Sequence, residues 1–240
     1  MIERLVDAAA RDLAMAPDVL RQRNFIKPAA MPYATATDKV YDSGDFAAHM
    51  ARAKQIGEWD GFKKRAAVAK RKGLIRGIGL ATYIEACGLA PSNIAGSLGA
   101  RAGLFEAGEV RFHPTGSVSV FTGSHSHGQG HETTFAQVVA DKLGIPVENV
   151  DVVHGDTGRI PFGMGTYGSR SLAVGGSAIM KALDKIIAKG KKIAAHFLEA
   201  AEGDMEFSEG QFRNAGTDRG IGIEALARRS YIPGQLPMGE

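Results

Sequence analysis

Glycine is concentrated in the middle of this chain, and that cluster constrains the fold more than any other feature. Residues 123–176 hold 11 glycines in 54 positions, whereas the whole chain has 31 in 240. Proteins on average contain about 7% glycine. Patterns typical of strands and helices interrupt the cluster, so it is not a flexible linker. Glycine is used where the backbone is left-handed or where another group comes close to it. Tight turns would explain the cluster, and so would a ligand bound by main-chain amides.

Composition excludes several classes of protein. The chain is 44% hydrophobic and 23% charged, which is typical of a globular protein and excludes wholesale disorder. No run of 18 uncharged apolar residues occurs, and Glu3 and Arg4 interrupt any secretory leader, so neither a membrane span nor export is expected. The charge of +3 gives little support to a nucleic-acid partner, and the basic run at 63–72 is interpreted as a solvated helix face.

The lone cysteine bears on location. Cys87 cannot form an internal disulfide, so a cytoplasmic location is expected, and we expect this residue to be packed rather than nucleophilic.

Hydrophobic periodicity predicts an α+β fold in two parts. Residues 1–72 are predicted to form a helical lead-in and connection, and residues 73–240 to form mixed sheets and helices. The predicted elements of the first part are helices at 2–14, 17–24, 45–56 and 59–72. Those of the second part are a buried strand at 74–86, a hairpin of 109–113 with 117–121, a helix at 131–143 ended by Gly144, a strand at 149–154, a helix at 173–201, a hairpin at 205–213 and a helix at 223–231.

The first glycine loop, residues 123–130 (GSHSHGQG), lies between a predicted strand and a predicted helix. The first N–H groups of a helix have no internal partner, and its dipole places positive charge at that end. Gly128 and Gly130 would let a ligand approach the backbone, and Thr133 adds a hydroxyl. This arrangement predicts a site for a phosphate or another anionic group.

The second glycine loop, residues 163–168 (GMGTYG), precedes the long predicted helix and matches the pattern GxGxxG. Its context is wrong for a dinucleotide-binding Rossmann unit, because residues 156–162 separate it from the preceding strand and Asp184 falls inside the helix. The loop is interpreted as an anion cradle with Arg170 as a bidentate clamp.

Three histidines leave a second interpretation open. His125, His127 and His131, with Glu132 beside them, could bind zinc and make the chain a zinc hydrolase. The stretch HETTF does not match HExxH, however, and no further pair of ligands has suitable spacing. The alternative is that these side chains form hydrogen bonds at a polar ligand.

Several segments together carry a family resemblance. GSHSHGQGHETTFAQVVADKLGIP and VDVVHGDTGRIPFGMGTYGSRS, supported by RGIGLATYIEACG and HPTGSVSVFTG, resemble the molybdenum-binding large subunit of the xanthine dehydrogenase and aldehyde oxidase superfamily. The resemblance is strongest to the aerobic carbon monoxide dehydrogenase large chains and covers nearly the whole sequence.

The resemblance implies a cofactor and the residues that bind it. The two loops of this family hold molybdopterin, usually as its cytosine dinucleotide, and dithiolene sulfurs of the cofactor rather than side chains hold the molybdenum. The matching positions are Gly128, Gln129, Gly130, His131 and Thr133 in the first loop, and Thr166, Tyr167, Gly168, Ser169, Arg170 and Ser171 in the second.

The resemblance also implies partners and an oxidoreductase activity on carbon monoxide, an aldehyde or an N-heterocycle. Electrons would pass to an iron–sulfur subunit and an FAD-binding subunit, which could hold the assembly at the inner membrane face. Two family features are missing: an upstream loop facing the molybdenum, and a GxGE glutamate that acts as base. Cys87 lies in EACG, outside such a loop. We therefore expect a partial chain that needs the remaining segments of the large subunit, or a non-catalytic binding or assembly fragment.

Overall fold

A computed structural model describes residues 1–37, 39–88, 92–97, 99–160, 162–232, 234 and 236–237. The chain forms two compact units, residues 1–84 and 85–240. The functional division into a lead-in, residues 1–72, and a cofactor region, residues 73–240, stays a prediction. Among the described residues, no helix is both long and apolar enough to cross a membrane.

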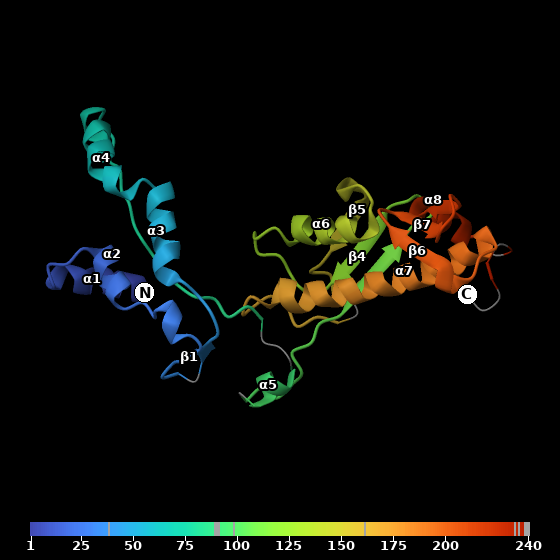
Figure 1. Ribbon diagram of the computed structural model, residues 1–240, viewed down its shortest axis with the longest axis horizontal. Coiled ribbons are helices and arrows are strands. Elements are labelled where there is room, and N and C mark those ends of the chain that lie inside the picture. The colour runs from blue at the N-terminus through green and yellow to red at the C-terminus, as the bar shows by residue number, and fades with distance from the viewer. Residues whose placement is uncertain are drawn as a thin grey trace. The chain divides into compact units, whose positions relative to one another are not determined.

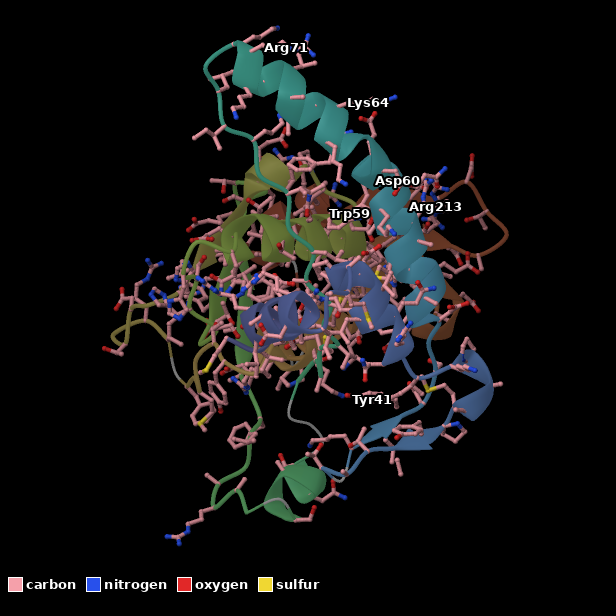
Figure 2. The ribbon with its side chains drawn as sticks, turned by 90° about the vertical axis from the view of Figure 1, so that its left-hand side faces the viewer. Tyr41, Trp59, Asp60, Lys64, Arg71 and Arg213 are labelled. Carbon is pink, nitrogen blue, oxygen red and sulfur yellow. The ribbon has the colours of Figure 1, made fainter. Side chains whose placement is uncertain are left out.

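The first unit is mainly helical, as predicted. Arg21 joins its first two helices: the buried guanidinium forms ion pairs of 2.8 Å with Glu3 and with Asp7. Asp45 accepts a 2.9 Å hydrogen bond from the Ala48 N–H and so caps the third helix. The elements are α1 (Ile2–Asp12), α2 (Pro17–Arg23), the short pair β1 (Tyr33–Ala34) and β2 (Val40–Tyr41), α3 (Phe46–Ile56) and α4 (Phe62–Arg71). Figure 2 shows Lys64 and Arg71 projecting from α4, which is consistent with a solvated basic face.

The predicted buried strand at 74–86 is wrong. Residues 74–86 form neither helix nor strand, and Ile75 and Tyr83 are 101% and 87% exposed. β-Branched and aromatic residues favour a strand only when a neighbouring strand satisfies the backbone and packs on the side chains. None of the described strands pairs with this segment. Cys87, directly after it, is exposed, which contradicts its predicted packing.

The second unit is built around a three-stranded sheet, and its α+β character is confirmed. β3 (Gly108–Phe112) and β4 (Val118–Thr122) form the predicted antiparallel hairpin. α6 (His131–Leu143) then leads to β5 (Val150–Val153), which pairs parallel to β4 with Val120 opposite Val152. Gly144, at φ 63°, ends α6 in the left-handed conformation as predicted. The parallel pairing places the first glycine loop and the segment after β5 at the same end of the sheet.

One long helix connects this sheet to a smaller one. α7 (Ser177–Leu198) follows a π-helical turn (Ser171–Gly176) and packs on β3 and then on β6 and β7, as Figure 1 shows. The second sheet contains β6 (Met205–Ser208), β7 (Gln211–Asn214) and β8 (Gly220–Gly222), followed by α8 (Ile223–Ser230). Phe135 and Val139 of α6 lie in the shared core with Ile179 and Leu183 of α7 and Phe212 of β7. The short helix α5 (Ser92–Ser97) precedes β3.

Candidate functional site

The first glycine loop connects β4 to α6 and leaves its backbone accessible. Gly128 and Gly130 adopt left-handed conformations, with φ of 99° and 80°. A Cβ atom added to either would meet nothing within 4 Å, so the space above both is open. The side chain of Gln129 is exposed, and its Oε1 accepts a hydrogen bond from the His127 N–H. The loop therefore presents main-chain groups to solvent, as a ligand cradle requires.

The second glycine loop is fixed by contacts along its length. Gly165, at φ 83°, also faces open space. The Thr166 and Ser171 hydroxyls lie 2.9 Å apart, and the Gly168 carbonyl accepts a 3.1 Å bond from the Gly88 N–H. The remaining predicted residues of this loop differ in environment: Tyr167 is 41% exposed, and the exposed Ser169 donates to Glu85.

The two glycine loops meet backbone to backbone. A Cβ atom on Gly123 would lie 2.1 Å from the Gly163 Cα, and one on Gly163 would lie 2.3 Å from the Gly123 Cα. A Cβ atom on Gly175 would lie 2.6 Å from the Ser124 hydroxyl. Only glycine permits this approach. The two loops, distant in sequence, therefore form one continuous surface.

Arg170 does not act as the predicted anion clamp. The residue is 0% exposed, and one terminal nitrogen donates to Glu106 at 2.9 Å and to the Gly165 carbonyl at 2.8 Å. The other donates to the carbonyls of Leu104 and Phe105 at 3.1 and 2.9 Å. Both terminal nitrogens are thus occupied by protein acceptors, and the guanidinium holds the second loop in place.

Glu106 is the residue that the sequence interpretation missed. Its carboxylate is buried, and besides Arg170 it accepts from the Met164 N–H at 3.3 Å and the Ala107 N–H at 3.2 Å. The sequence offered one indication that Glu106 is special: it is the single charged residue in the stretch 102–108. Its partner is 64 positions away, which sequence spacing does not reveal.

The zinc hydrolase interpretation is wrong for the residues described. No group of three His, Cys, Asp or Glu side chains among them is arranged to hold a metal ion. The Nδ1 atoms of His125 and His154 instead lie 2.9 Å apart, and His131 turns into the core, where its ring lies 5.3 Å from that of Phe135. The alternative of hydrogen-bonding histidines is the one that this geometry favours.

Glu132 is the strongly perturbed ionisable group of the site. A hydrogen bond from its own backbone N–H, at the start of α6, and a second from the His154 ring lower the pKa of Glu132 from 4.5 to about 2. The His154 Nε2 lies 2.8 Å from the Glu132 Oε1. Glu132 is therefore a carboxylate at neutral pH, and it accepts a hydrogen bond from one of the first N–H groups of the helix.

Three buried polar atoms of this region lack a protein partner. The Ser124 hydroxyl, the His131 Nδ1 and the Arg170 Nε are inaccessible, and none of them forms a hydrogen bond with any described residue. Gly130 occupies the N-cap position of α6 and provides no side-chain cap, and Thr133 is exposed in the first turn. Buried polar groups normally have partners, so these atoms and the open backbone of the loops match what a polar, anionic cofactor would contact.

The sequence of residues 52–238 matches the model of the molybdopterin cofactor-binding domain family. The chain belongs to this family. The predicted resemblance is thus confirmed, and molybdopterin is the cofactor after which the family is described. The chain is 44% identical to the carbon monoxide dehydrogenase large chain of Hydrogenophaga pseudoflava over 223 residues, which cover 91% of this chain and 27% of that protein.

Solved structures show the same similarity. A reconstituted CO dehydrogenase from Oligotropha carboxidovorans matches with a TM-score of 0.71 at 39% identity and covers 96% of this chain and 29% of that one. Quinoline 2-oxidoreductase from Pseudomonas putida 86 matches with a TM-score of 0.72 at 30% identity, and the match covers 99% of this chain and 30% of that one. The chain therefore spans between a quarter and a third of the length of these relatives.

Proposed function

We propose that the two glycine loops of this chain bind molybdopterin as its cytosine dinucleotide, within an oxidoreductase of the molybdenum hydroxylase class. The contact between Gly123 and Gly163 carries the proposal, because it joins the two loops into one surface. The buried Ser124 hydroxyl and His131 Nδ1, which lack protein partners, belong to the first loop and to the residue that follows it. The family membership of residues 52–238 supports the choice of cofactor.

Each predicted residue has a role that its surroundings allow. Gly128, Gly130 and Gly165 have open space above them and let the cofactor approach the main chain, and Gly168 shapes the second loop through its left-handed conformation. The exposed Gln129, Thr133, Tyr167 and Ser169 offer side-chain donors or acceptors beside the cofactor. Thr166 and Ser171 are joined by their hydroxyls and support the second loop. Arg170 and Glu106 hold the same loop from beneath. When bound, the cofactor supplies the molybdenum redox chemistry, and this chain binds and orients it.

The proposal extends to partners. The relatives are three to four times longer than the matched region, so the rest of a large subunit would complete the pocket. We propose further that an iron–sulfur subunit and an FAD-binding subunit receive the electrons. Carbon monoxide is the first substrate to test, because the relative with 44% identity is a carbon monoxide dehydrogenase large chain.

Gln129→Ala, made in an enzyme assembled with this chain, tests the cofactor site. Gln129 is exposed beside the open glycine backbone, so we expect molybdenum and released cytosine nucleotide to fall together while the melting temperature stays within about 1–2 °C, as for a surface substitution. Gln137→Ala is the matched control, since Gln137 is also an exposed glutamine and lies on α6, the helix that follows the loop, away from the helix N-terminus. Unchanged molybdenum with a lower melting temperature would contradict the proposal.

A further inference from the structure

Three side chains from three segments form a continuous hydrogen-bonded chain beside the first glycine loop. Glu132 lies in the first turn of α6, His154 follows β5 directly, and His125 lies in the loop itself. The Glu132 Oε1 is 2.8 Å from the His154 Nε2, and the His154 Nδ1 is 2.9 Å from the His125 Nδ1. The side chain of His154 is only 14% exposed. The largely buried His154 ring therefore contacts one residue before Gly128–Gly130 and one residue after them.

The chemistry of these contacts fixes where the protons lie. Glu132 is ionised and can only accept, so the His154 Nε2 must carry a proton. The contact between two Nδ1 atoms needs one donor and one acceptor. His154 is therefore either neutral and accepts from His125, or charged and donates to it. The pair retains its bond with one extra proton but not with two, because two imidazolium rings would both be donors.

We propose that His154 is a positioning residue, which holds His125 to Glu132 and thereby fixes the backbone of Gly128, Gln129 and Gly130 between them. His125 and Glu132 bracket this part of the loop, and His154 belongs to the neighbouring strand rather than to the loop. The loop glycines have no side chains of their own to define their conformation, and open space lies above Gly128 and Gly130. The consequence for cofactor binding rests on the proposed function.

Other polar and charged groups surround the three hydrogen-bonded side chains. The ring of His127 lies edge-on to that of His125, with centroids 5.0 Å apart, and Ser126 donates to Glu132. Asp151 of β5 is exposed, and Asp156 is exposed and accepts from the Gly158 N–H at 2.9 Å. Protonation of both His125 and His154 removes their shared bond, so the loop loosens when the second proton binds.

Nitrogen-detected NMR of the histidine rings in the 240-residue chain tests the proton positions. We expect a proton on the His154 Nε2 at neutral pH, and a hydrogen-bond coupling between the Nδ1 atoms of His125 and His154. A His154 ring with a bare Nε2, or no coupling between the two Nδ1 atoms, would overturn the proposal. This measurement needs no variant and does not depend on any cofactor.

Hydrogen exchange tests the positioning role. In His154→Phe, which removes both bonds but retains a ring, we expect amides of residues 125–131 to exchange at least about tenfold faster, since loss of even one hydrogen bond has an effect of this size. His154→Asn is the second variant in case the first does not fold. His113→Asn is the control, because the His113 Nε2 contacts the Ser119 hydroxyl, 2.9 Å away, outside this loop. Unchanged loop exchange in a folded His154 variant would contradict the proposal.

Cofactor content of the assembled enzyme separates this proposal from the proposed function. Residues that orient a site without contacting the ligand typically change its retention about tenfold. Loss of molybdenum in both His154→Phe and Gln129→Ala supports both ideas. Loss in Gln129→Ala alone overturns the positioning role and leaves the proposed function standing. Retention in both overturns the proposed function.

Discussion

At the residue scale, the most informative finding is that Arg170 and Glu106 form a pair with both side chains 0% exposed. Taking two charges out of water is costly, and further hydrogen bonds to carbonyls and N–H groups offset that cost, although the Arg170 Nε has no partner among the described residues. Here the Gly165, Leu104 and Phe105 carbonyls surround the guanidinium, and two N–H groups contact the carboxylate. The pair therefore ties the second glycine loop to the segment before β3.

Glu106→Gln should strongly destabilise the second unit. Removing one partner of a buried ion pair leaves an uncompensated charge, at a cost of about 3–5 kcal/mol. Urea denaturation of the chain measures this change. Glu109→Gln is the control, because the exposed Glu109–Arg111 pair, at 3.0 Å, should contribute less than about 1 kcal/mol. Equal effects of the two substitutions would show that Arg170 finds another partner.

Gly123→Ala should separate the two glycine loops. The new methyl group would lie 2.1 Å from the Gly163 Cα and 2.9 Å from the Phe162 carbonyl oxygen. The Glu106 carboxylate, 2.8 Å away, is buried and held by Arg170, so no flexible side chain can move aside. We expect a loss of stability of about 1–3 kcal/mol, typical of overpacking, together with loss of bound molybdenum in the assembled enzyme. Gly203→Ala, with nothing within 4 Å of the added atom, is the control. A Gly123→Ala variant of normal stability would refute the backbone contact.

At the scale of single elements, α6 determines the electrostatics of the site. Its N-terminus has no side-chain cap, and Glu132 occupies its first turn as an ionised group. Anionic groups are favoured at this end of a helix. The same helix contributes Phe135 and Val139 to the core, which anchors it against the rest of the second unit.

The stability of the second unit should depend on pH through Glu132. The pKa of Glu132 in the folded state, about 2, lies below the ordinary value of 4.5, so the folded state favours the deprotonated carboxylate. The contribution is therefore fully present above about pH 4.5 and is lost as the pH falls towards 2. We expect the difference in unfolding free energy between the wild type and Glu132→Gln to shrink over this range. A constant difference, or the same pattern in the exposed Glu148→Gln control, would contradict this assignment.

At the scale of the whole molecule, the 240 residues present many apolar side chains to solvent. Ile2, Ile75 and Tyr83 are at least 75% exposed, and Phe105 and Leu172 of the second unit are more than half exposed. Large exposed apolar surfaces promote association. We expect the isolated chain to oligomerise in a concentration-dependent manner, which sedimentation velocity would detect; a stable monomer at high concentration would refute this expectation.

The isolated chain should also be inactive. A general base works best with a pKa near the working pH. The glutamates at the candidate site are otherwise engaged: Glu132 has a pKa of about 2, Glu106 is paired with Arg170, and Glu85 accepts from Ser169. We expect no reduction of an artificial electron acceptor with carbon monoxide, aldehydes or purines. Turnover at an ordinary enzymatic rate by the chain alone would require a base elsewhere in it.

The sequence by itself determined the local elements and the family. Apolar residues at helical spacing predicted α6 and the body of α7, alternation predicted the hairpin of β3 and β4, and glycine marked both loops. These features depend on neighbours a few positions away, which a sequence displays directly. The motifs of the loops also sufficed for the family assignment, which the match over residues 52–238 confirms.

Only the tertiary structure decided which distant groups meet. The pairing of Arg170 with Glu106 spans 64 positions, and that of His154 with His125 spans 29. An arginine in a glycine loop has the same local sequence whether it contacts a phosphate or a buried carboxylate. Likewise, the apolar segment 74–86 lacks a strand partner, although its composition favours one. In each case the deciding energy comes from desolvation and long-range contacts, which local sequence does not encode.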